Sequence, residues 1–330
     1  MKILPFRLIS AAWTVVAMGL VIAFPASLTL LRVADPGSLR VSSPDPTPYG
    51  YTWSLSLFIV PFTVLALWFH RRKDLVLQGR AYWRAVPILT ATGFSLDILF
   101  GSEFLRFCNP AATLGWRVPV FGGRVPVEEF VFYLLGFMVV LMTYIWCDEC
   151  WVARYNDQDY SQGLARVGRL ARFHWSSLWF GIACIVLAVI AKKMIFHEEG
   201  LPSYLIFLIV ASLIPSIGLF ESVQPYINWR AFSITFFFIL LVSLLWEVTL
   251  AIPYRWWGYQ DRAMVGLKIG AWSNLPIEAV LVWLAVTYTT VIVYEVVKIW
   301  QASGETARKA FLAKGGSKAR SRDSNEAPTP

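Results

Sequence analysis

The sequence predicts an all-α integral membrane protein of about eight transmembrane helices, in which two groups of three spans form tandem parallel repeats. The first observation behind this prediction is composition: of 330 residues, 57% are apolar and 16 are tryptophan, which sets the chain apart from ordinary soluble domains. The second is that apolar segments long enough to cross a bilayer recur along the chain. The third is an arrangement of acidic residues that occurs twice inside this apolar sequence.

The spans follow from the apolar segments taken in order. The first is interpreted as a membrane helix and not as a cleaved signal peptide, although Lys2 and Arg7 precede it, because its apolar stretch is longer than that of a signal peptide. The eight spans are expected at Leu8–Leu31, Tyr51–His70, Ala85–Phe104, Pro126–Trp146, His174–Ala191, Ser203–Phe220, Ala231–Ile252 and Pro276–Ile299.

The distribution of basic residues predicts the orientation. Nineteen Lys and Arg residues fall on the side of the two termini and ten on the opposite side, which by the positive-inside rule puts both termini in the cytoplasm. The expected location is therefore the inner, cytoplasmic membrane. The net charge of +8 then indicates contact with anionic lipid headgroups, and no nucleic-acid partner is expected.

Self-similarity divides the chain further. Spans two to four form one unit and spans six to eight another, and in each unit a Trp-Arg-Ala triplet, at residues 83–85 and 229–231, precedes the repeated arrangement of acidic residues. Because the two units start four spans apart, they have the same orientation, as parallel repeats do. The expected divisions are 1–50, an N-terminal span and loop; 51–151, the first unit; 152–202, a basic loop and linker span; 203–300, the second unit; and 301–330, a disordered basic tail.

Each unit carries acids at matching positions. In the first, Asp97 lies 31 positions before Glu128, which is followed by Glu129; in the second, Glu247 lies 31 positions before Glu278. Ionisable groups at membrane depth are costly and usually functional. The matched spacing therefore predicts a functional role for these five acids.

A structural interpretation covers part of this pattern. Pro126 and Pro276 suit the first position of a helix, and acids in the first turn interact favourably with its exposed amide groups. That accounts for acids beside the two prolines. It does not account for Asp97 and Glu247, which are expected well inside their helices, or for the identical spacing.

Aromatic residues accompany the acids. Spacing of i,i+4 places Glu128 beside Phe132 and Glu129 beside Tyr133 on neighbouring faces of one helix. A carboxyl group kept out of water favours its protonated form, and aromatic faces stabilise a cation in a dry site. Such a site suits protonation of an alkene followed by steering of a carbocation, which water would quench.

Motifs for other chemistry are missing from the sequence. There is no G-x-G-x-x-G, P-loop, H-E-x-x-H or G-x-S-x-G motif. The three histidines form no motif, and Cys147 and Cys150, although spaced as C-x-x-C, have no second pair. We therefore expect neither a metal site nor a cofactor.

These motifs resemble the integral-membrane, non-flavin lycopene cyclases of bacteria, archaea and fungi, which occur as two small subunits or as one fused protein. The family hallmark is a repeated three-span domain with a Pro-x-Glu-(Glu) motif followed by aromatic residues. Residues 126–132, Pro-Val-Glu-Glu-Phe-Val-Phe, match it closely, and the second copy matches through Trp246-Glu247, residues 256–259 and residues 275–278. The similarity covers roughly 60% of the chain, and Ala279 stands where the family often has a second Glu.

The resemblance implies a redox-neutral, cofactor-independent isomerisation, of the intramolecular lyase type, that closes the ψ-ends of a linear carotenoid into rings within the bilayer. The catalytic residues it implies are Glu128 and Glu129 as the acid pair, Asp97 as a proton store, and Glu278 and Glu247 as their counterparts. The substrate-binding residues it implies are Phe130, Phe132, Tyr133 and Trp246.

Two alternatives stay open at this point: a related ψ-end hydratase, and a non-enzymatic isoprenoid-binding membrane protein. The expected partners are the carotenoid, the lipid bilayer and other enzymes of carotenoid synthesis.

Overall fold

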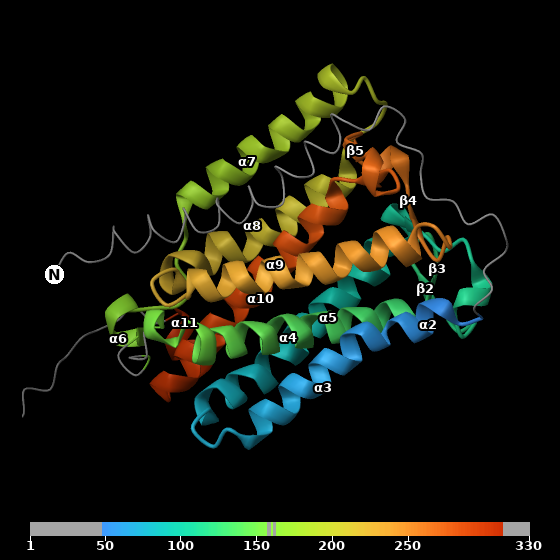
Figure 1. Ribbon diagram of the computed structural model, residues 1–330. Helices are drawn as coiled ribbons and strands as arrows, with labels where there is room; N and C mark the ends of the chain where they lie inside the picture. Colours follow the sequence, from blue (N-terminus) through green and yellow to red (C-terminus); the bar gives the residue numbers. More distant parts are fainter. Residues whose placement is uncertain (1–47, 157–159, 161–162, 313–330) are drawn as a thin grey trace, which may run out of the picture.

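The computed structural model describes residues 48–156, 160 and 163–312, and this part of the chain is mostly helical. It contains seven helical segments long and apolar enough to cross a membrane, which Figure 1 shows as a bundle of roughly aligned helices. A mostly helical architecture with several helices long and apolar enough to cross a membrane is therefore confirmed. The first predicted span, Leu8–Leu31, lies outside the described residues.

Most of the seven segments begin and end within a few residues of the predicted spans. The exception is the third span, which begins nine residues before its predicted start, because Arg80 and Arg84 continue the helix beyond its apolar part. The segments are α2 (Gly50–Ser54) with α3 (Ser56–Arg71), α4 (Val76–Phe104), α5 (Val127–Trp146) with a π-helical turn at Cys147–Trp151, α7 (Trp175–Ile190) with a π-helical turn at Ala191–Ile195, α8 (Ser203–Val223), α9 (Trp229–Trp246) with a π-helical turn at Glu247–Ala251, and α10 (Glu278–Ser303).

The loops at one end of the bundle contain short antiparallel strand pairs (Figure 1). The all-α prediction missed these strands. Each strand has only two to four residues, too few for a clear alternating pattern. The strands are β1 (Leu105–Arg106) paired with β4 (Gly258–Tyr259), β2 (Arg117–Val120) paired with β3 (Gly123–Pro126), and β5 (Lys268–Ile269) paired with β6 (Leu275–Pro276).

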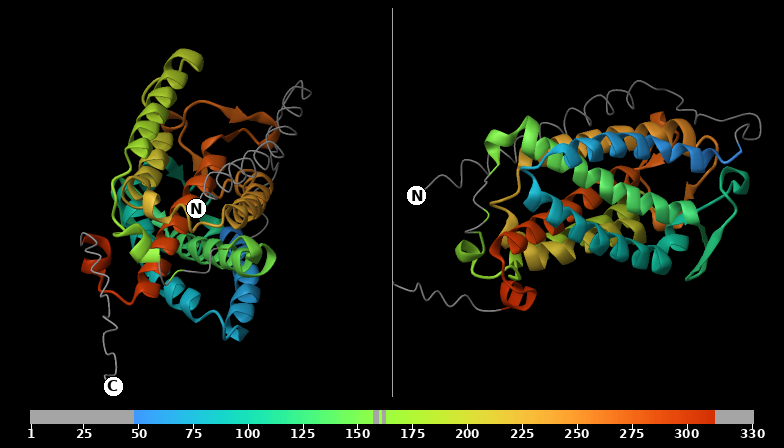
Figure 2. Two further views of the ribbon diagram at one scale, coloured as in Figure 1. Left: turned by 90° about the vertical axis from the view of Figure 1, so that its left-hand side faces the viewer. Right: turned by 90° about the horizontal axis from the view of Figure 1, so that it is seen from below.

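Helix α10 is central to the packing. It contacts α4, α5, α8 and α9, whereas α7 packs against α8 at the periphery of the bundle (Figure 2). A helix surrounded in this way buries several faces, and α10 accordingly contributes the buried side chains of Val291, Ile292, Tyr294 and Val296 to the largest hydrophobic cluster.

The prediction of a disordered tail over 301–330 is wrong for its first part, and residues 313–330 lie outside the described residues. Helix α10 continues to Ser303, and the short helix α11 (Ala307–Leu312) follows it. Ala310 is fully buried, and its carbonyl oxygen accepts a hydrogen bond of 2.9 Å from the Leu170 amide. This contact with the loop before α7 orders a segment whose polar composition alone favoured disorder.

Candidate functional site

The loop before α5 and the loop before α10 are each held by an equivalent pair of hydrogen bonds. The backbone N–H of Leu114 donates to Glu128 Oε1 and that of Val265 donates to Glu278 Oε1, both at 2.6 Å. One residue earlier, the amide of Val127 donates to the Trp116 carbonyl and that of Ile277 to the Leu267 carbonyl, both at 3.0 Å. Each Pro-x-Glu acid therefore ties the preceding loop to the first turn of its helix.

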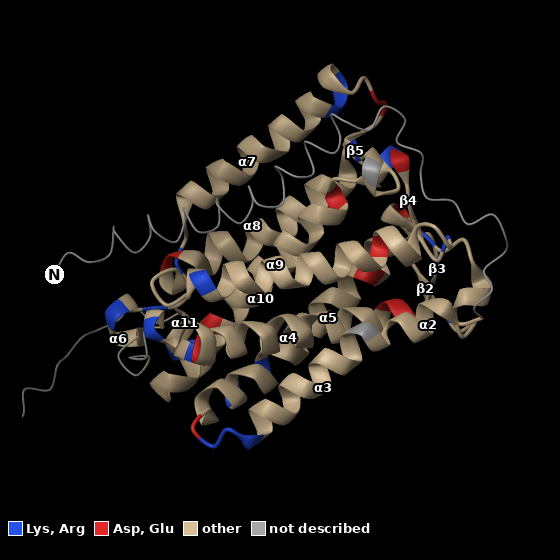
Figure 3. Cartoon of the chain, viewed as in Figure 1, with Lys and Arg blue, Asp and Glu red and all other residues tan. Residues whose placement is uncertain are grey.

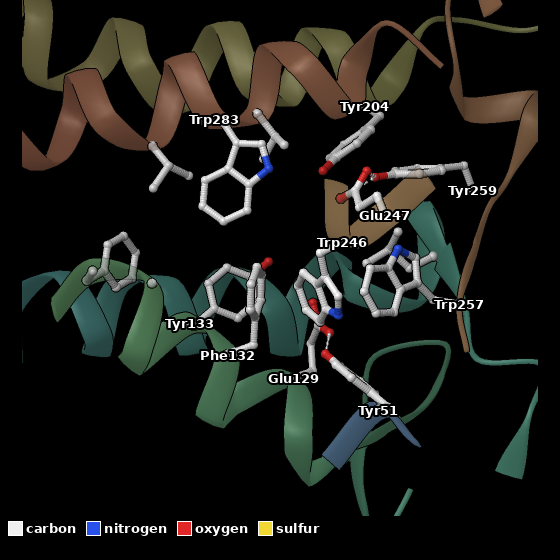
Figure 4. Close-up of a pocket in the computed structure, with 15 residues that line it drawn as sticks. Tyr51, Glu129, Phe132, Tyr133, Tyr204, Trp246, Glu247, Trp257, Tyr259 and Trp283 are labelled. Carbon is white, nitrogen blue, oxygen red and sulfur yellow. Dashed lines mark hydrogen bonds between the residues drawn. The ribbon is translucent and has the colours of Figure 1, made fainter. Parts of the chain in front are cut away.

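A cavity of about 70 Å³ lies next to these helix starts, between α5, α9 and α10. Two of its lining residues are acids, Glu129 from the first unit and Glu247 from the second, which lie on opposite sides (Figure 4). Most of the remaining wall is aromatic. The lining residues are Tyr51, Leu105, Glu129, Phe132, Tyr133, Gly136, Phe137, Tyr204, Trp246, Glu247, Trp257, Tyr259, Val282, Trp283 and Val286.

Each cavity acid accepts a hydrogen bond from a tyrosine hydroxyl. Tyr51 donates to Glu129 Oε2 at 2.7 Å, and Tyr259 lies 3.1 Å from both carboxylate oxygens of Glu247. Both acids are at most 5% exposed. Burial also raises the pKa of the Tyr259 hydroxyl well above its ordinary value, so this group stays a proton donor at neutral pH.

Local structure positions the second acid and its tyrosine. Helix α9 ends at Trp246, and the wider π-helical turn that begins at Glu247 changes the direction of the following side chains. Tyr259 pairs with Leu105 in the β1–β4 ladder. The end of α4 in the first unit thus fixes the tyrosine that contacts the acid of the second.

Trp246 forms the aromatic wall between the two acids. Its ring centroid lies 4.8 Å from Trp257, 5.2 Å from Phe58, 5.3 Å from Phe132 and 6.0 Å from Tyr51. The rings meet at tilted or edge-on angles, which their quadrupoles favour. Figure 4 shows Trp246, Trp257 and Phe132 around the space between the acids. This arrangement presents π-faces to any positive charge that develops there.

The structure brings together five of the nine predicted site residues. Glu129, Glu247, Phe132, Tyr133 and Trp246 line the cavity.

The other four predicted residues lie elsewhere. Phe130 packs edge-on against Phe94 at 5.1 Å. Glu128 also accepts a bond of 2.7 Å from the Thr52 hydroxyl, so its Oε1 serves two donors. Glu278 and Glu128 therefore make the contacts expected of helix-start anchors.

Asp97 is a separate case. It is 2% exposed, and neither of its carboxylate oxygens has a hydrogen-bond partner within the described part of the chain. It interacts electrostatically with Glu129. A side chain at Gly101 would collide with the Asp97 carboxylate, so glycine one turn later makes room for this acid.

Sequence reasoning missed Tyr51, Tyr204, Tyr259, Trp257 and Trp283 as cavity residues. One signal was present: the run Trp-Trp-Gly-Tyr at residues 256–259 is strongly aromatic for a loop. Tyr51 stands at the start of a span, where aromatic residues usually anchor helices at the membrane interface, so the sequence alone gave no reason to assign it to the site.

In the part of the chain that the structure describes, no three His, Cys, Asp or Glu side chains converge as a metal site would require. Comparisons of the chain with protein-family models, with curated proteins and with solved structures give no match. The resemblance to the membrane lycopene cyclases therefore depends on the motifs in the sequence alone.

Proposed function

We propose that this chain is an integral-membrane carotenoid cyclase of the lycopene cyclase type, an isomerase that closes ψ-ends into rings by acid catalysis. The observation that carries the proposal is the pair of tyrosine-bound carboxyl groups on opposite sides of an aromatic cavity inside the helical bundle. Protonation and deprotonation then take place in one dry site, and no electrons are exchanged.

In this mechanism Glu129 protonates the terminal double bond of the carotenoid. The resulting cation lies against the faces of Trp246 and Phe132 while the neighbouring double bond attacks it and closes the six-membered ring. Glu247 accepts the proton that the ring loses, and Tyr51 and Tyr259 orient the two carboxyl groups. Asp97, which interacts with Glu129, is the group from which that acid recovers its proton.

Substrate entry requires movement of side chains. The cavity of about 70 Å³ is smaller than the roughly 300–1,000 Å³ of common ligand pockets. Trp283 and Phe132, whose rings meet edge-on at 5.7 Å, would have to separate for a carotenoid end group to reach the acids.

The two units would be tandem parallel repeats that together build this one site. Supporting this are the matched acid spacing, the paired loop hydrogen bonds and the strand pair that precedes each Pro-x-Glu helix. The cavity takes its acids from different positions of the two units, so it would be a composite of both.

We also propose the cytoplasmic membrane as the location, with both termini in the cytoplasm. Lys and Arg side chains gather at the end of the bundle near α6 (Gly163–Val167), α11 and the α3–α4 turn (Figure 3). Lys298 and Lys192, counted on opposite sides in the sequence, are both buried, so the asymmetry persists without them. Reporter fusions after Glu326 and within 45–49 should indicate opposite compartments; an extracytoplasmic C-terminus would overturn this orientation.

The test of function is co-expression of the chain with a lycopene-producing pathway, followed by pigment chromatography and mass measurement. Cyclisation gives products of unchanged mass with ring end groups. The hydratase alternative would add the mass of water. An isoprenoid carrier would leave the pigment unchanged, which would contradict the proposal.

A further inference from the structure

A buried charge cluster lies at the opposite end of α10 from the cavity. Lys298 Nζ is 2.8 Å from Glu295 Oε1 and 3.6 Å from Asp148 Oδ2, and all three side chains are at most 2% exposed. The Tyr144 hydroxyl donates to Glu295 Oε1 at 3.0 Å, and Lys298 donates to the Tyr160 hydroxyl at 3.0 Å. Two carboxyl groups face one ammonium, so the triad is electrically neutral only when it holds one further proton.

One carboxylate oxygen of this cluster, Glu295 Oε2, is buried and has no hydrogen-bond partner among the described residues. A buried polar atom of this kind is costly unless water or another group satisfies it. It points to a hydrated contact that the protein side chains do not supply.

Three hydroxyl groups connect the two regions along one face of α10. Thr287, Thr290 and Tyr294 are at most 1% exposed, and none of their hydroxyls bonds to another residue within the described ranges. The spacing is helical: Trp283, which lines the cavity, is four residues before the first, and Lys298 is four residues after the last.

Two exposed threonines in the membrane helices behave differently, whereas the buried hydroxyls of Thr90 and Thr143 also lack a partner among the described residues. The exposed Thr63 and Thr92 each donate to the carbonyl oxygen four residues earlier, at 2.8 Å. That bond satisfies a threonine within a helix. Thr287 and Thr290 do not donate to the carbonyl oxygen four residues earlier, although they are buried, where an unpaired hydroxyl is costly. Their hydroxyls are therefore available to other partners.

The spacing of these hydroxyls suits bridging water. The Cβ atoms of Thr287 and Thr290, at i,i+3, lie about 5–6 Å apart, a gap that one water molecule spans with two hydrogen bonds of about 2.8 Å each. From Trp283 to Lys298 the helix rises about 22 Å. On the neighbouring helix, Ser243 is fully buried four residues before Glu247, and its hydroxyl has no partner among the described residues.

We propose that the hydroxyls of Thr287, Thr290 and Tyr294 hold a file of water molecules that carries protons between the cavity and the Lys298–Glu295–Asp148 cluster. This inference deepens the proposed function, on which its catalytic role depends. Each ring closure takes one proton from Glu129 and returns one to Glu247, with no electron transferred. The file lets Glu247 release its proton toward the cluster and the acid side of the cavity regain one from it, so that the site is reset.

The test measures hydrogen–deuterium exchange of the cavity carboxyl groups by infrared spectroscopy. The full-length protein in lipid nanodiscs is transferred to deuterated water, and the carboxylic C=O band that disappears in Glu129→Gln is followed with time. In the double variant Thr287→Val/Thr290→Val we expect exchange at least about tenfold slower, since a bridging water loses hydrogen bonds at each step.

Two control proteins separate the water file from general packing. Thr63→Val/Thr92→Val removes two hydroxyls that bond within their own helices and should exchange as the unaltered protein does. Thr287→Ser/Thr290→Ser keeps the hydroxyls and should restore fast exchange. Unchanged exchange in the buried Val variant, or equal slowing in the Thr63/Thr92 control or the Ser variant, would overturn the proposal.

Turnover in deuterated water distinguishes this inference from the proposed function. With the file intact, each new ring should gain one solvent deuteron; in the buried Val variant, the proton lost from one substrate should return to the next and lower the label. Slowed infrared exchange in a protein that leaves lycopene unchanged would refute the cyclase and support the file. If instead the buried Val variant cyclises lycopene with full label, and its carboxyl exchange is as fast as in the unaltered protein, the cyclase is supported and the file is refuted.

Discussion

The loops that lead into α5 and α10 have the same local architecture but contribute differently to the cavity. In each, a glutamate in the first turn accepts a backbone hydrogen bond of 2.6 Å from the preceding loop. The next residue is Glu129 in one case and Ala279 in the other. Glu129 lines the cavity, whereas Ala279 is fully buried and does not line it.

This difference separates two roles that the Pro-x-Glu motif combines. The first glutamate fastens the loop, and because that role is structural, it occurs in both units. The second glutamate supplies a carboxyl group to the cavity, and one unit is sufficient because the other unit supplies Glu247 from its middle helix. Repeated architecture therefore need not mean repeated chemistry.

Adding the missing carboxylate should produce the largest effect. Ala279→Glu places an acid at a fully buried position with no partner prepared for it, which we expect to destabilise the protein by about 3–5 kcal/mol. Thermal unfolding in detergent would measure the loss, with the volume-increasing but uncharged Ala279→Leu as control. A stable, more active Ala279→Glu protein would instead show that the units hold two independent sites.

Removing the cavity acids should affect turnover and leave folding intact. Glu129→Gln and Glu247→Gln should each lower cyclisation by at least ~10²-fold, the usual contribution of a general acid or base. Pigment formation normalised to protein amount is the measurement, and Glu278→Gln is the matched control, expected to retain most turnover per folded molecule. Full activity in Glu129→Gln would remove the first unit's acid from the mechanism.

Removing the loop anchors should affect stability more than chemistry. Glu128→Ala removes the carboxyl acceptor of the Leu114 N–H, on an exposed residue, and Glu278→Ala removes that of the Val265 N–H, on a buried one, each at a cost of about 1.5–3 kcal/mol. Melting temperatures should fall in both variants, and further in Glu128→Ala, because the Thr52 hydroxyl loses its acceptor as well. A loss of turnover in either protein without a loss of stability would assign the anchor a catalytic role.

Much of the fold was predictable from the sequence. Long apolar runs gave the helices, because backbone groups in a bilayer must be bonded within the helix. The start of α4 was not predictable in this way, since Arg80 and Arg84 end the apolar run but not the helix. Likewise α11 forms because Ala310 is buried against residues far away in the sequence, which local composition does not reveal.

The candidate site was predictable only in part, for a related reason. Matched spacing identified Glu247, and the Pro-x-Glu-Glu motif identified Glu129, as members of two similar sets. Which members meet depends on packing between the units: α5 against α9, and β1 against β4. Tyr51 and Tyr259 join the site through those contacts and have no counterpart in the motif, so a search by repeat could not find them.

The two tyrosines offer the finest comparison between the halves of the cavity. Tyr51→Phe removes one hydrogen bond to a single oxygen of Glu129, whereas Tyr259→Phe removes a hydroxyl placed equally near both oxygens of Glu247. Each loss should lower turnover by about tenfold, the equivalent of roughly one hydrogen bond.

If Glu129 donates the proton and Glu247 accepts one, the two variants should differ in isotope effect. Tyr51→Phe misplaces the proton donor and should enlarge the solvent isotope effect, whereas Tyr259→Phe should enlarge the effect of deuterium carried by the substrate at the carbon that loses a proton. The reverse assignment of the two effects would exchange the roles of the acids and leave the composite cavity intact.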